Sequence, residues 1–424
     1  MLLQFTVGNF LSIKEKRTFT MESTSIKDIP ISNIVHQNKY RILRTAGIYG
    51  ANSSGKSNFI KAFAAMGNMV ITSVKLNDNE ELMYDPFLLS TETEDAPTFF
   101  EIVYLKDNTR YRYGFEYNLT DIIGEWLFLK DANKQENILF LRNKDGIGVG
   151  ENFLEGVDLE EKTNNNRLFL SLVAQLGGQI SKQILDWFSK EFNVLSGLSS
   201  KGYTGFTKKM LLEQNDICKE SLSFFKTLQL GFDQIFANER EFEETQLPED
   251  LPQNIRRKLV KDLEGKKSID VLTVHKKYNK KGQIVGDEIF NILERESSGT
   301  NKLFDLAGPI FDSLLKGKIL IIDELDAKMH PLISQYIIDL FNNPLSNKYN
   351  AQLIFTTHDT HLLSTNILRR DQIWFTEKDN KESTDIYSMM DVVLPDGSKP
   401  RNDSNYEKNY INGRYGAIPF IKNF

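Results

Sequence analysis

The amino-acid sequence predicts an α/β protein in which two α/β blocks flank a mostly helical insertion. Residues 1–45 alternate between apolar and polar side chains, which is typical of short strands. Between residues 164 and 192 the apolar residues recur at helical spacing instead, and from residue 289 strand-like and helix-like stretches alternate again. These changes predict an N-terminal lobe over 1–154, an insertion over 155–288 and a C-terminal lobe over 289–424.

Length and composition exclude several classes of protein. The 424 residues are 40% hydrophobic and carry a formal net charge of −6, which argues against a surface that is constantly coated with DNA but leaves a local basic groove open. The single cysteine, Cys218, excludes an intrachain disulfide framework and a cysteine-cluster zinc site. Because no apolar run approaches the roughly 18 residues of a membrane span, and the start lacks a basic stretch before an apolar core, we expect a cytoplasmic protein.

The N-terminal lobe contains a strand, a loop and a helix in immediate succession. The apolar residues 46–49 predict a strand, and the stretch 58–70, rich in Phe, Ala and Met, predicts a helix. Further along, the aromatic residues of 98–129 predict antiparallel strands, with a turn at Asp107 and Asn108.

The insertion has a different pattern. Helical spacing continues over about 208–236, whereas residues 239–267 change from acidic to basic and predict a solvated linker or mobile arm. Residues 271–277 and the stretch from 284 onwards predict a hairpin. In the C-terminal lobe, the wholly apolar residues 319–322 predict a buried strand.

The loop between the first strand and helix fits the pattern G-x-x-x-x-G-K-S of a phosphate-binding loop. Glycines allow backbone N–H groups to curl around phosphates, and the N-terminus of the following helix favours anions. Lys56 would reach the β- and γ-phosphates, and the Ser57 hydroxyl would bind Mg²⁺. The candidate nucleotide-binding residues are Gly50, Asn52, Ser53, Ser54, Gly55, Lys56, Ser57 and Asn58.

Two acidic residues, Asp323 and Glu324, follow the apolar strand at 319–322. Taken alone, they could be solvated acids at the end of an ordinary strand. Beside a phosphate-binding loop, however, Asp323 lies where a Walker B carboxylate holds Mg²⁺, and Glu324 is placed to orient the attacking water. We therefore predict Ser57 and Asp323 as metal-binding residues and Glu324 as a catalytic residue.

Two further segments indicate no function alone, but beside a phosphate-binding loop and a Walker B strand they become candidate parts of the same site. Residues 296–302 combine glycine and hydroxyl residues at the start of a predicted helix, where a plain helix cap is the simpler alternative. Their position before the Walker B strand makes Ser298 and Gly299 candidates for a variant ABC signature. His358 ends another apolar strand, where it could form a hydrogen bond with the γ-phosphate.

In this order, the four motifs resemble those of ABC-type ATPases of the SMC, RecF and OLD kind. The sequence SSGTNK, the stretch 323–331 and the tail 412–419 resemble, more narrowly, AAA-family ATPases of bacterial phage-defence systems, of the RloA/AbiLii type and related to PtuA of Septu. The resemblance implies a P-loop NTPase head of ABC/SMC type with a mixed sheet, and ATP and Mg²⁺ as cofactors. It also implies slow ATP hydrolysis, a homodimer or higher even oligomer, and a separate effector protein, a nuclease or toxin.

Some features depart from these families. Ser-Gly-Thr-Asn replaces the Ser-Gly-Gly-Gln of transporters, and residues 84–87 stand where a Q-loop glutamine is usual. The chain after His358 is too short for the Toprim nuclease domain of OLD proteins, so any effector is expected to be separate. Two alternatives to a defence sensor or switch remain: a RecF-like DNA repair ATPase that binds DNA directly, and an ATP-bound scaffold with little turnover.

Overall fold

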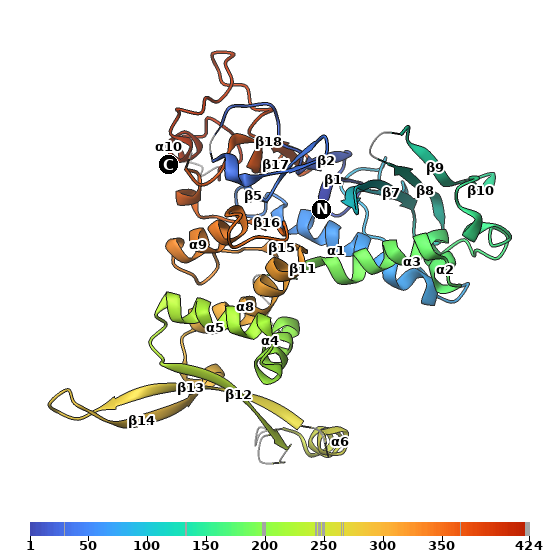
Figure 1. Ribbon diagram of the computed structural model, residues 1–424. Coiled ribbons are helices and arrows are strands. Elements are labelled where there is room, and N and C mark those ends of the chain that lie inside the picture. Colours follow the sequence, from blue (N-terminus) through green and yellow to red (C-terminus); the bar gives the residue numbers. More distant parts are fainter. Residues whose placement is uncertain are drawn as a thin grey trace. The chain divides into compact units, whose positions relative to one another are not determined.

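The computed structural model describes residues 1–28, 30–131, 134–196, 201–241, 244, 247, 251–263, 265, 267–364 and 366–419 (Figure 1). The chain forms two compact units: a head made of Met1–Leu198 with Ser313–Phe424, and an inserted unit made of Ser199–Asp312. These boundaries differ from the expected ones at 155 and 289. Leu168 and Trp187 share the core of the head, whereas Phe304 and Phe311 pack against Phe225 and Phe224, respectively, in the inserted unit.

The head contains two large sheets and a small hairpin. One sheet has seven antiparallel strands in the order β10-β9-β8-β7-β6-β1-β2. Its strands are β1 (Leu2–Gly8), β2 (Arg17–Thr20), β6 (Thr98–Lys106), β7 (Thr109–Tyr117), β8 (Ile122–Lys130), β9 (Asn137–Asn143) and β10 (Gly146–Val149). The hairpin pairs β3 (Ile34–Gln37) with β4 (Tyr40–Leu43).

The second sheet of the head is mixed and has the order β11-β15-β16-β5-β17-β18. Its strands are β5 (Thr45–Tyr49), β11 (Phe192–Ser196), β15 (Ile319–Asp323), β16 (Gln352–Thr356), β17 (Ile373–Lys378) and β18 (Thr384–Ser388). All neighbouring pairs are parallel except β17 and β18. The carboxyl ends of β15, β16 and β5 therefore meet at one edge, which is where an open α/β sheet binds its ligand.

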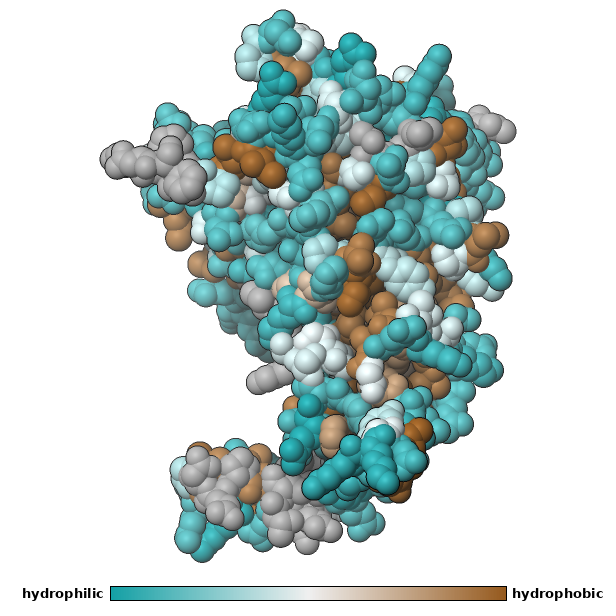
Figure 2. Space-filling view, turned by 90° about the vertical axis from the view of Figure 1, so that its left-hand side faces the viewer, coloured by the Kyte–Doolittle hydropathy of each residue, from teal (hydrophilic) through white to brown (hydrophobic). Residues whose placement is uncertain are grey.

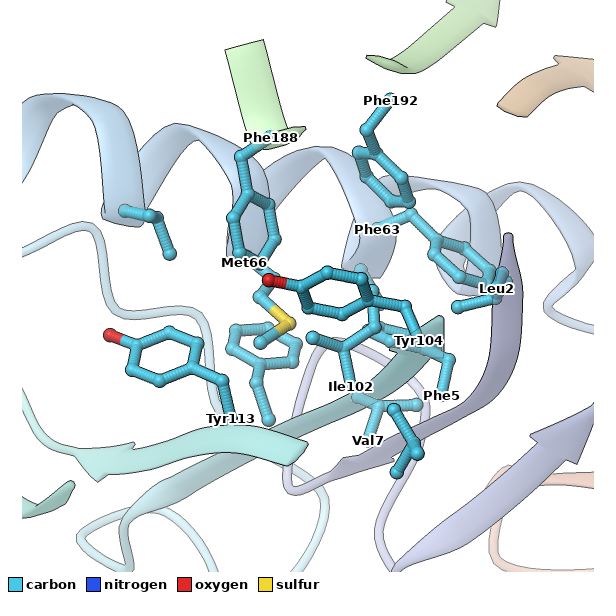
Figure 3. Close-up of a cluster of buried hydrophobic side chains, with 14 of the residues drawn as sticks. Leu2, Phe5, Val7, Phe63, Met66, Ile102, Tyr104, Tyr113, Phe188 and Phe192 are labelled. Atoms are coloured by element: carbon cyan, nitrogen blue, oxygen red, sulfur yellow. The ribbon is translucent and has the colours of Figure 1, made fainter. Parts of the chain in front are cut away.

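Helix α1 (Lys56–Thr72) joins the two sheets through one hydrophobic core. Phe59, Phe63, Met66 and Val70 recur at intervals of three and four residues and so lie on one buried face. Figure 3 shows Phe63 and Met66 of this helix against the aromatic and aliphatic side chains of the antiparallel sheet. The rings of Phe63 and Phe5 stack with their centroids 3.8 Å apart. This packing fixes the start of α1 relative to both sheets.

Several predicted elements of the head are confirmed. Strand β5 and helix α1 lie where expected, and Lys106 pairs with Thr109 across the turn at Asp107 and Asn108. The predicted helical stretch 164–192 is interrupted, because Gly177 adopts a positive φ of 100°. It forms α2 (Phe169–Gln175), α3 (Gln179–Asp186), a π-helical turn (Trp187–Glu191) and the start of β11. The head also contains α9 (Pro331–Asn342) and α10 (Tyr406–Ile411).

The inserted unit combines helices with a three-stranded antiparallel sheet in the order β12-β13-β14. Its elements are α4 (Lys201–Glu213), α5 (Asp216–Leu228), β12 (Gln234–Glu241), α6 (Gln253–Leu263), β13 (Lys267–Tyr278), β14 (Ile284–Asn291), α7 (Ile292–Arg295) and α8 (Ser298–Lys316), the last of which continues into the head. The predicted hairpin is confirmed as β13 and β14.

Two predictions for the inserted unit are wrong in part. The helix expected over 208–236 ends at Leu228, because the chain turns at Gly231, with a φ of 93°, and continues as β12. The expected mobile arm over 239–267 begins inside β12, which pairs with β13 up to Glu241. Residues 253–263 form α6, whereas residues 242–243, 245–246, 248–250, 264 and 266 lie outside the described residues.

The surface is mainly hydrophilic, as expected for a chain in which 26% of the residues are charged. Figure 2 shows a face of the molecule that is mainly hydrophilic, with smaller apolar areas. Among the helices that the structure describes, none has the length and apolar character needed to cross a lipid bilayer.

Candidate nucleotide-binding site

The loop from Gly50 to Gly55 connects β5 to α1 and is walled by strands from the other end of the chain. Gly55 adopts a φ of 108°, and a Cβ atom there would lie 2.2 Å from the Thr384 Oγ1. A Cβ atom on Gly50 would lie 2.5 Å from the Thr376 carbonyl oxygen. Only glycine fits at either position, so the two glycines of the motif are required by the close approach of β17 and β18.

Hydroxyl groups fix the shape of this loop. The hydroxyls of Ser54 and Thr376 are 2.6 Å apart, and the Thr384 Oγ1 lies 3.0 Å from the Ser54 carbonyl oxygen. The Asn58 side chain donates a hydrogen bond of 2.8 Å to the Ser12 hydroxyl, which also lies 2.8 Å from the Thr384 Oγ1. Thr376, Thr384 and Ser12 are site residues that the sequence analysis missed, since no motif marks them.

Two residues of the loop are exposed, in contrast to Ser54, which is buried and hydrogen-bonded to β17 and β18. Asn52 and Ser53 are exposed, and Ser53 has a positive φ of 64°. Gly55 serves as the N-cap of α1, and Ser57 lies half-buried in the first turn. The predicted nucleotide-binding residues of the loop thus form one continuous cradle at the N-terminus of a long helix, a favourable place for an anion.

Lys56 is the buried cation of the site. Lys56 is only 5% exposed, and its Nζ donates hydrogen bonds to the carbonyl oxygens of Gly50, at 2.7 Å, and Ala51, at 2.9 Å. Burial lowers the pKa of Lys56 to about 8, although the nearby carboxylates of Asp323 and Glu324 act in the opposite direction. A buried ammonium group held by backbone carbonyls is well prepared to exchange them for phosphate oxygens.

Asp323 is the last residue of β15 and Glu324 follows it, beside the end of the parallel strand β16. Thr356, the last residue of β16, donates a hydrogen bond of 2.6 Å to the Asp323 carboxylate and accepts one of 2.7 Å from the Glu324 backbone N–H. Glu324 has a φ of 54°, a left-handed conformation that is uncommon outside glycine and recurs at functional sites. Thr356 therefore aligns both predicted acidic residues, a role that the sequence did not reveal.

His358 lies at the same edge of the sheet, two residues beyond β16. Its backbone N–H donates to both carboxylate oxygens of Asp326, each at 3.3 Å. Burial, followed by the positive charge of Lys56, lowers the pKa of His358 below its ordinary value of 6.5, so the imidazole is neutral at pH 7. The pKa values of Lys56 and His358 both respond to the charges of Asp323, Glu324 and Asp326, so the head brings these groups within electrostatic reach of one another.

Ser298 and Gly299 belong to the inserted unit and not to the head. They occupy the first turn of α8, which Ser297 caps by accepting a hydrogen bond of 3.1 Å from the Thr300 N–H. The simpler interpretation of this segment, a helix cap, is therefore correct as far as Ser297 is concerned. Because Ser297 provides the cap, Ser298 and Gly299 are the first two residues of the helix itself.

The residues of the head fit a nucleotide with its metal ion. The loop ends at Gly55, the N-cap of α1, where the backbone N–H groups of a helix N-terminus favour an anion, and Lys56 offers a buried positive charge. In the part of the chain that the structure describes, no group of three or more His, Cys, Asp or Glu residues could hold a metal ion. Because Mg²⁺ is usually bound by one or two carboxylates plus phosphates and water, the carboxylate of Asp323 with the hydroxyl of Ser57 suits this ion when a nucleotide supplies phosphate oxygens.

Residues 84–87, which replace a Q-loop, lie beside the N-terminal segment rather than within this cluster. The Phe87 N–H donates to the Asn9 side chain at 2.9 Å, and the Asp85 carbonyl accepts from the Leu11 N–H at 2.8 Å. A hollow of about 250 Å³ lies between this segment and the start of α1, bordered by Pro86 and Asn58.

The fold and the site together define a P-loop ATPase head with a mixed sheet, which confirms the predicted fold class. Residues 46–364 match the family model described as "AAA domain, putative AbiEii toxin, Type IV TA system". The chain therefore belongs to this family. The match extends from β5 to just beyond His358, so it contains the phosphate-binding loop, the Walker B strand and the whole inserted unit.

Solved structures show more distant likenesses. The SMC head bound to the C-winged helix domain of ScpA has 14% identity and a TM-score of 0.43, over 91% of this chain and 97% of that one. The SMC head domain from Thermotoga maritima has 12% identity and a TM-score of 0.39, over 91% and 98%. The recombination mediator RecF with ATP has 11% identity and a TM-score of 0.32, over 84% and 93%. No curated protein matches the sequence.

Proposed function

We propose that this protein is an ATP-driven switch of bacterial antiphage defence that dimerises around ATP and controls a separate effector. The buried Lys56, held by loop carbonyls and within electrostatic reach of the carboxylates at the end of β15, is the observation that carries the ATPase part of the proposal. The family description names a toxin of a toxin–antitoxin system, which favours control of a toxic effector over DNA repair or a passive scaffold.

Each residue of the cluster has a defined role in this proposal. Lys56 and the loop N–H groups bind the β- and γ-phosphates, while Ser57 and Asp323 hold the Mg²⁺. When bound, Mg²⁺ neutralises the charge that develops on the phosphates. Glu324 orients the attacking water, and the neutral His358 imidazole forms a hydrogen bond to a γ-phosphate oxygen.

Two variants test the ATPase assignment. Lys56→Ala should abolish nucleotide binding, because it removes the buried positive charge. Glu324→Gln should bind ATP normally and reduce kcat by about 10²-fold, as expected when a positioned base is lost. Nucleotide titration and steady-state phosphate release measure these effects. Hydrolysis at the wild-type rate by Glu324→Gln would show that the catalytic assignment is wrong.

Dimerisation concerns Ser298 and Gly299. In the ABC-type arrangement, the signature of one subunit completes the nucleotide site of the other, so two sites share one isologous interface with C₂ symmetry. Ser298→Arg should therefore leave nucleotide binding by the single subunit intact and prevent the ATP-dependent dimer. Mass measurement with and without ATP checks this expectation. A variant that dimerises and hydrolyses ATP normally would reduce the segment to a helix cap.

A further inference from the structure

Glu296 lies two positions before Ser298, the first of the two signature residues, yet its side chain binds residues of the neighbouring sheet. Its Oε1 accepts a hydrogen bond of 2.7 Å from the Thr273 hydroxyl and lies 2.7 Å from the His275 Nε2. The Glu296 side chain is only 10% exposed. A carboxylate this deeply buried needs hydrogen-bond donors, and here both come from the central strand β13.

The two donors are held rigidly. Thr273 and His275 are two residues apart on β13, so they point to the same face of the sheet. Thr273 is fully buried, and the Phe290 ring of β14 lies against the His275 imidazole with centroids 4.6 Å apart. The Phe232 ring meets the imidazole edge-on at 6.3 Å. A carboxylate only accepts hydrogen bonds, so the 2.7 Å contact of Glu296 with the His275 Nε2 suits the tautomer that has its hydrogen on Nε2.

Other charged groups near His275 are paired among themselves. Glu288 is the residue opposite His275 on β14, and its carboxylate binds Lys277 at 2.7 Å. Lys276, on the other face of β13, binds Asp233 and Asp287. Glu296 is thus the acidic group that the imidazole binds directly.

The backbone of Glu296 is hydrogen-bonded to the signature turn, which is the first turn of α8 and contains Ser298 and Gly299. The Asn301 side chain donates hydrogen bonds to the carbonyl oxygens of Glu296, at 3.3 Å, and Ser297, at 3.2 Å. Ser297 in turn caps α8 through Thr300. One residue therefore links the first turn of α8 to the middle of the sheet, through its backbone at one end and its carboxylate at the other.

We propose that Thr273, His275 and Glu296 are positioning residues that hold the signature turn in the orientation required for dimer closure. The inference rests on the proposed function of Ser298 and extends it, because it makes closure depend on the state of the β12-β13-β14 sheet. A molecule that shifts this sheet changes closure and turnover without touching the phosphate-binding loop.

The test uses full-length variants that change either the Thr273 hydroxyl alone or the Glu296 carboxylate that binds both Thr273 and His275. Thr273→Val keeps the shape of the buried side chain and removes its donor, whereas Thr273→Ser restores the hydroxyl. Glu296→Ala removes the link, and Glu296→Gln retains an acceptor. Lys277→Gln is the matched control on the same strand. Three quantities are measured: the Kd of a fluorescent ATP analogue at low protein concentration, the ATP-dependent dimer constant, and kcat with KM.

Thr273→Val and Glu296→Ala should bind the analogue within about twofold of wild type and dimerise about tenfold more weakly, with a matching loss of kcat. Thr273→Ser should recover most of the loss, and Lys277→Gln should show none. A purely structural role would instead lower nucleotide binding and folded fraction together, and that result would overturn the inference.

Ser298→Arg, measured alongside, separates the two levels of the proposal. If Ser298→Arg prevents closure while Thr273→Val and Glu296→Ala close normally, the positioning inference is wrong and the proposed function survives. If Ser298→Arg closes normally, the proposed function of the signature fails, and the inference fails with it.

Discussion

Raising the pH from 7 to 9 should weaken ATP binding about tenfold through one residue, Lys56. Burial lowers the pKa of Lys56 from its ordinary value of 10.5 to about 8. The ammonium form therefore falls from about nine tenths of the molecules at pH 7 to about one tenth at pH 9. Because only this form attracts the β- and γ-phosphates, the apparent Kd rises by the same factor. The pKa of His358 is lowered below 6.5, so the imidazole stays neutral over this range.

The assay is a titration with a fluorescent, non-hydrolysable ATP analogue at constant ionic strength and excess Mg²⁺. The control is Lys56→Arg, whose guanidinium keeps its charge at every pH used and should give a flat profile. A flat profile for the wild type, or the same rise in Kd for Lys56→Arg, would refute the role given to the Lys56 charge.

The same pKa shift has the opposite effect on the stability of the nucleotide-free protein. The pKa of Lys56 is lower in the folded state, at about 8, than its ordinary value of 10.5. Between these two pH values the unfolded state binds more protons, so the contribution of Lys56 makes the folded state more stable as the pH rises. Thermal unfolding of wild type and Lys56→Met should diverge over this window and run parallel below it.

Three other perturbations test the architecture of the head and insertion. Gly55→Ala places a Cβ against Thr384 at a φ of 108°, so it should lower stability by about 1–3 kcal/mol in thermal unfolding and abolish nucleotide binding. Thr356→Val removes the hydrogen bond to Asp323 and should reduce kcat about tenfold at unchanged nucleotide Kd, while Thr356→Ser restores it. Replacing residues 251–265 by a short Gly-Ser linker should leave ATP hydrolysis within about twofold and abolish protection against phage. Loss of hydrolysis with retained protection would show instead that this segment is structural.

The sequence predicted the parts of the site that depend on neighbouring residues. The phosphate-binding loop lies between a strand and a helix that its own flanking residues encode, and the strand before Asp323 is apolar throughout. Thr356 and Thr384 could not be found in this way, because their roles arise only when distant strands pair. Likewise, the first residues of β12, Gln234 to Phe236, fall at the end of a stretch with helical spacing, but pairing with β13 decides their conformation.

The walls of the phosphate-binding loop also have a consequence for synthesis of the protein on the ribosome. The contacts of Ser54 with Thr376 and Thr384 span 322 and 330 residues, so the loop leaves the ribosome long before the strands that enclose it. The contiguous unit Ser199–Asp312 can form first, since domains generally fold as units in the order of their synthesis. An unfinished or prematurely terminated chain that lacks β17 and β18 therefore cannot close its ATP site. Translation itself delays the switch until nearly the whole chain has been made.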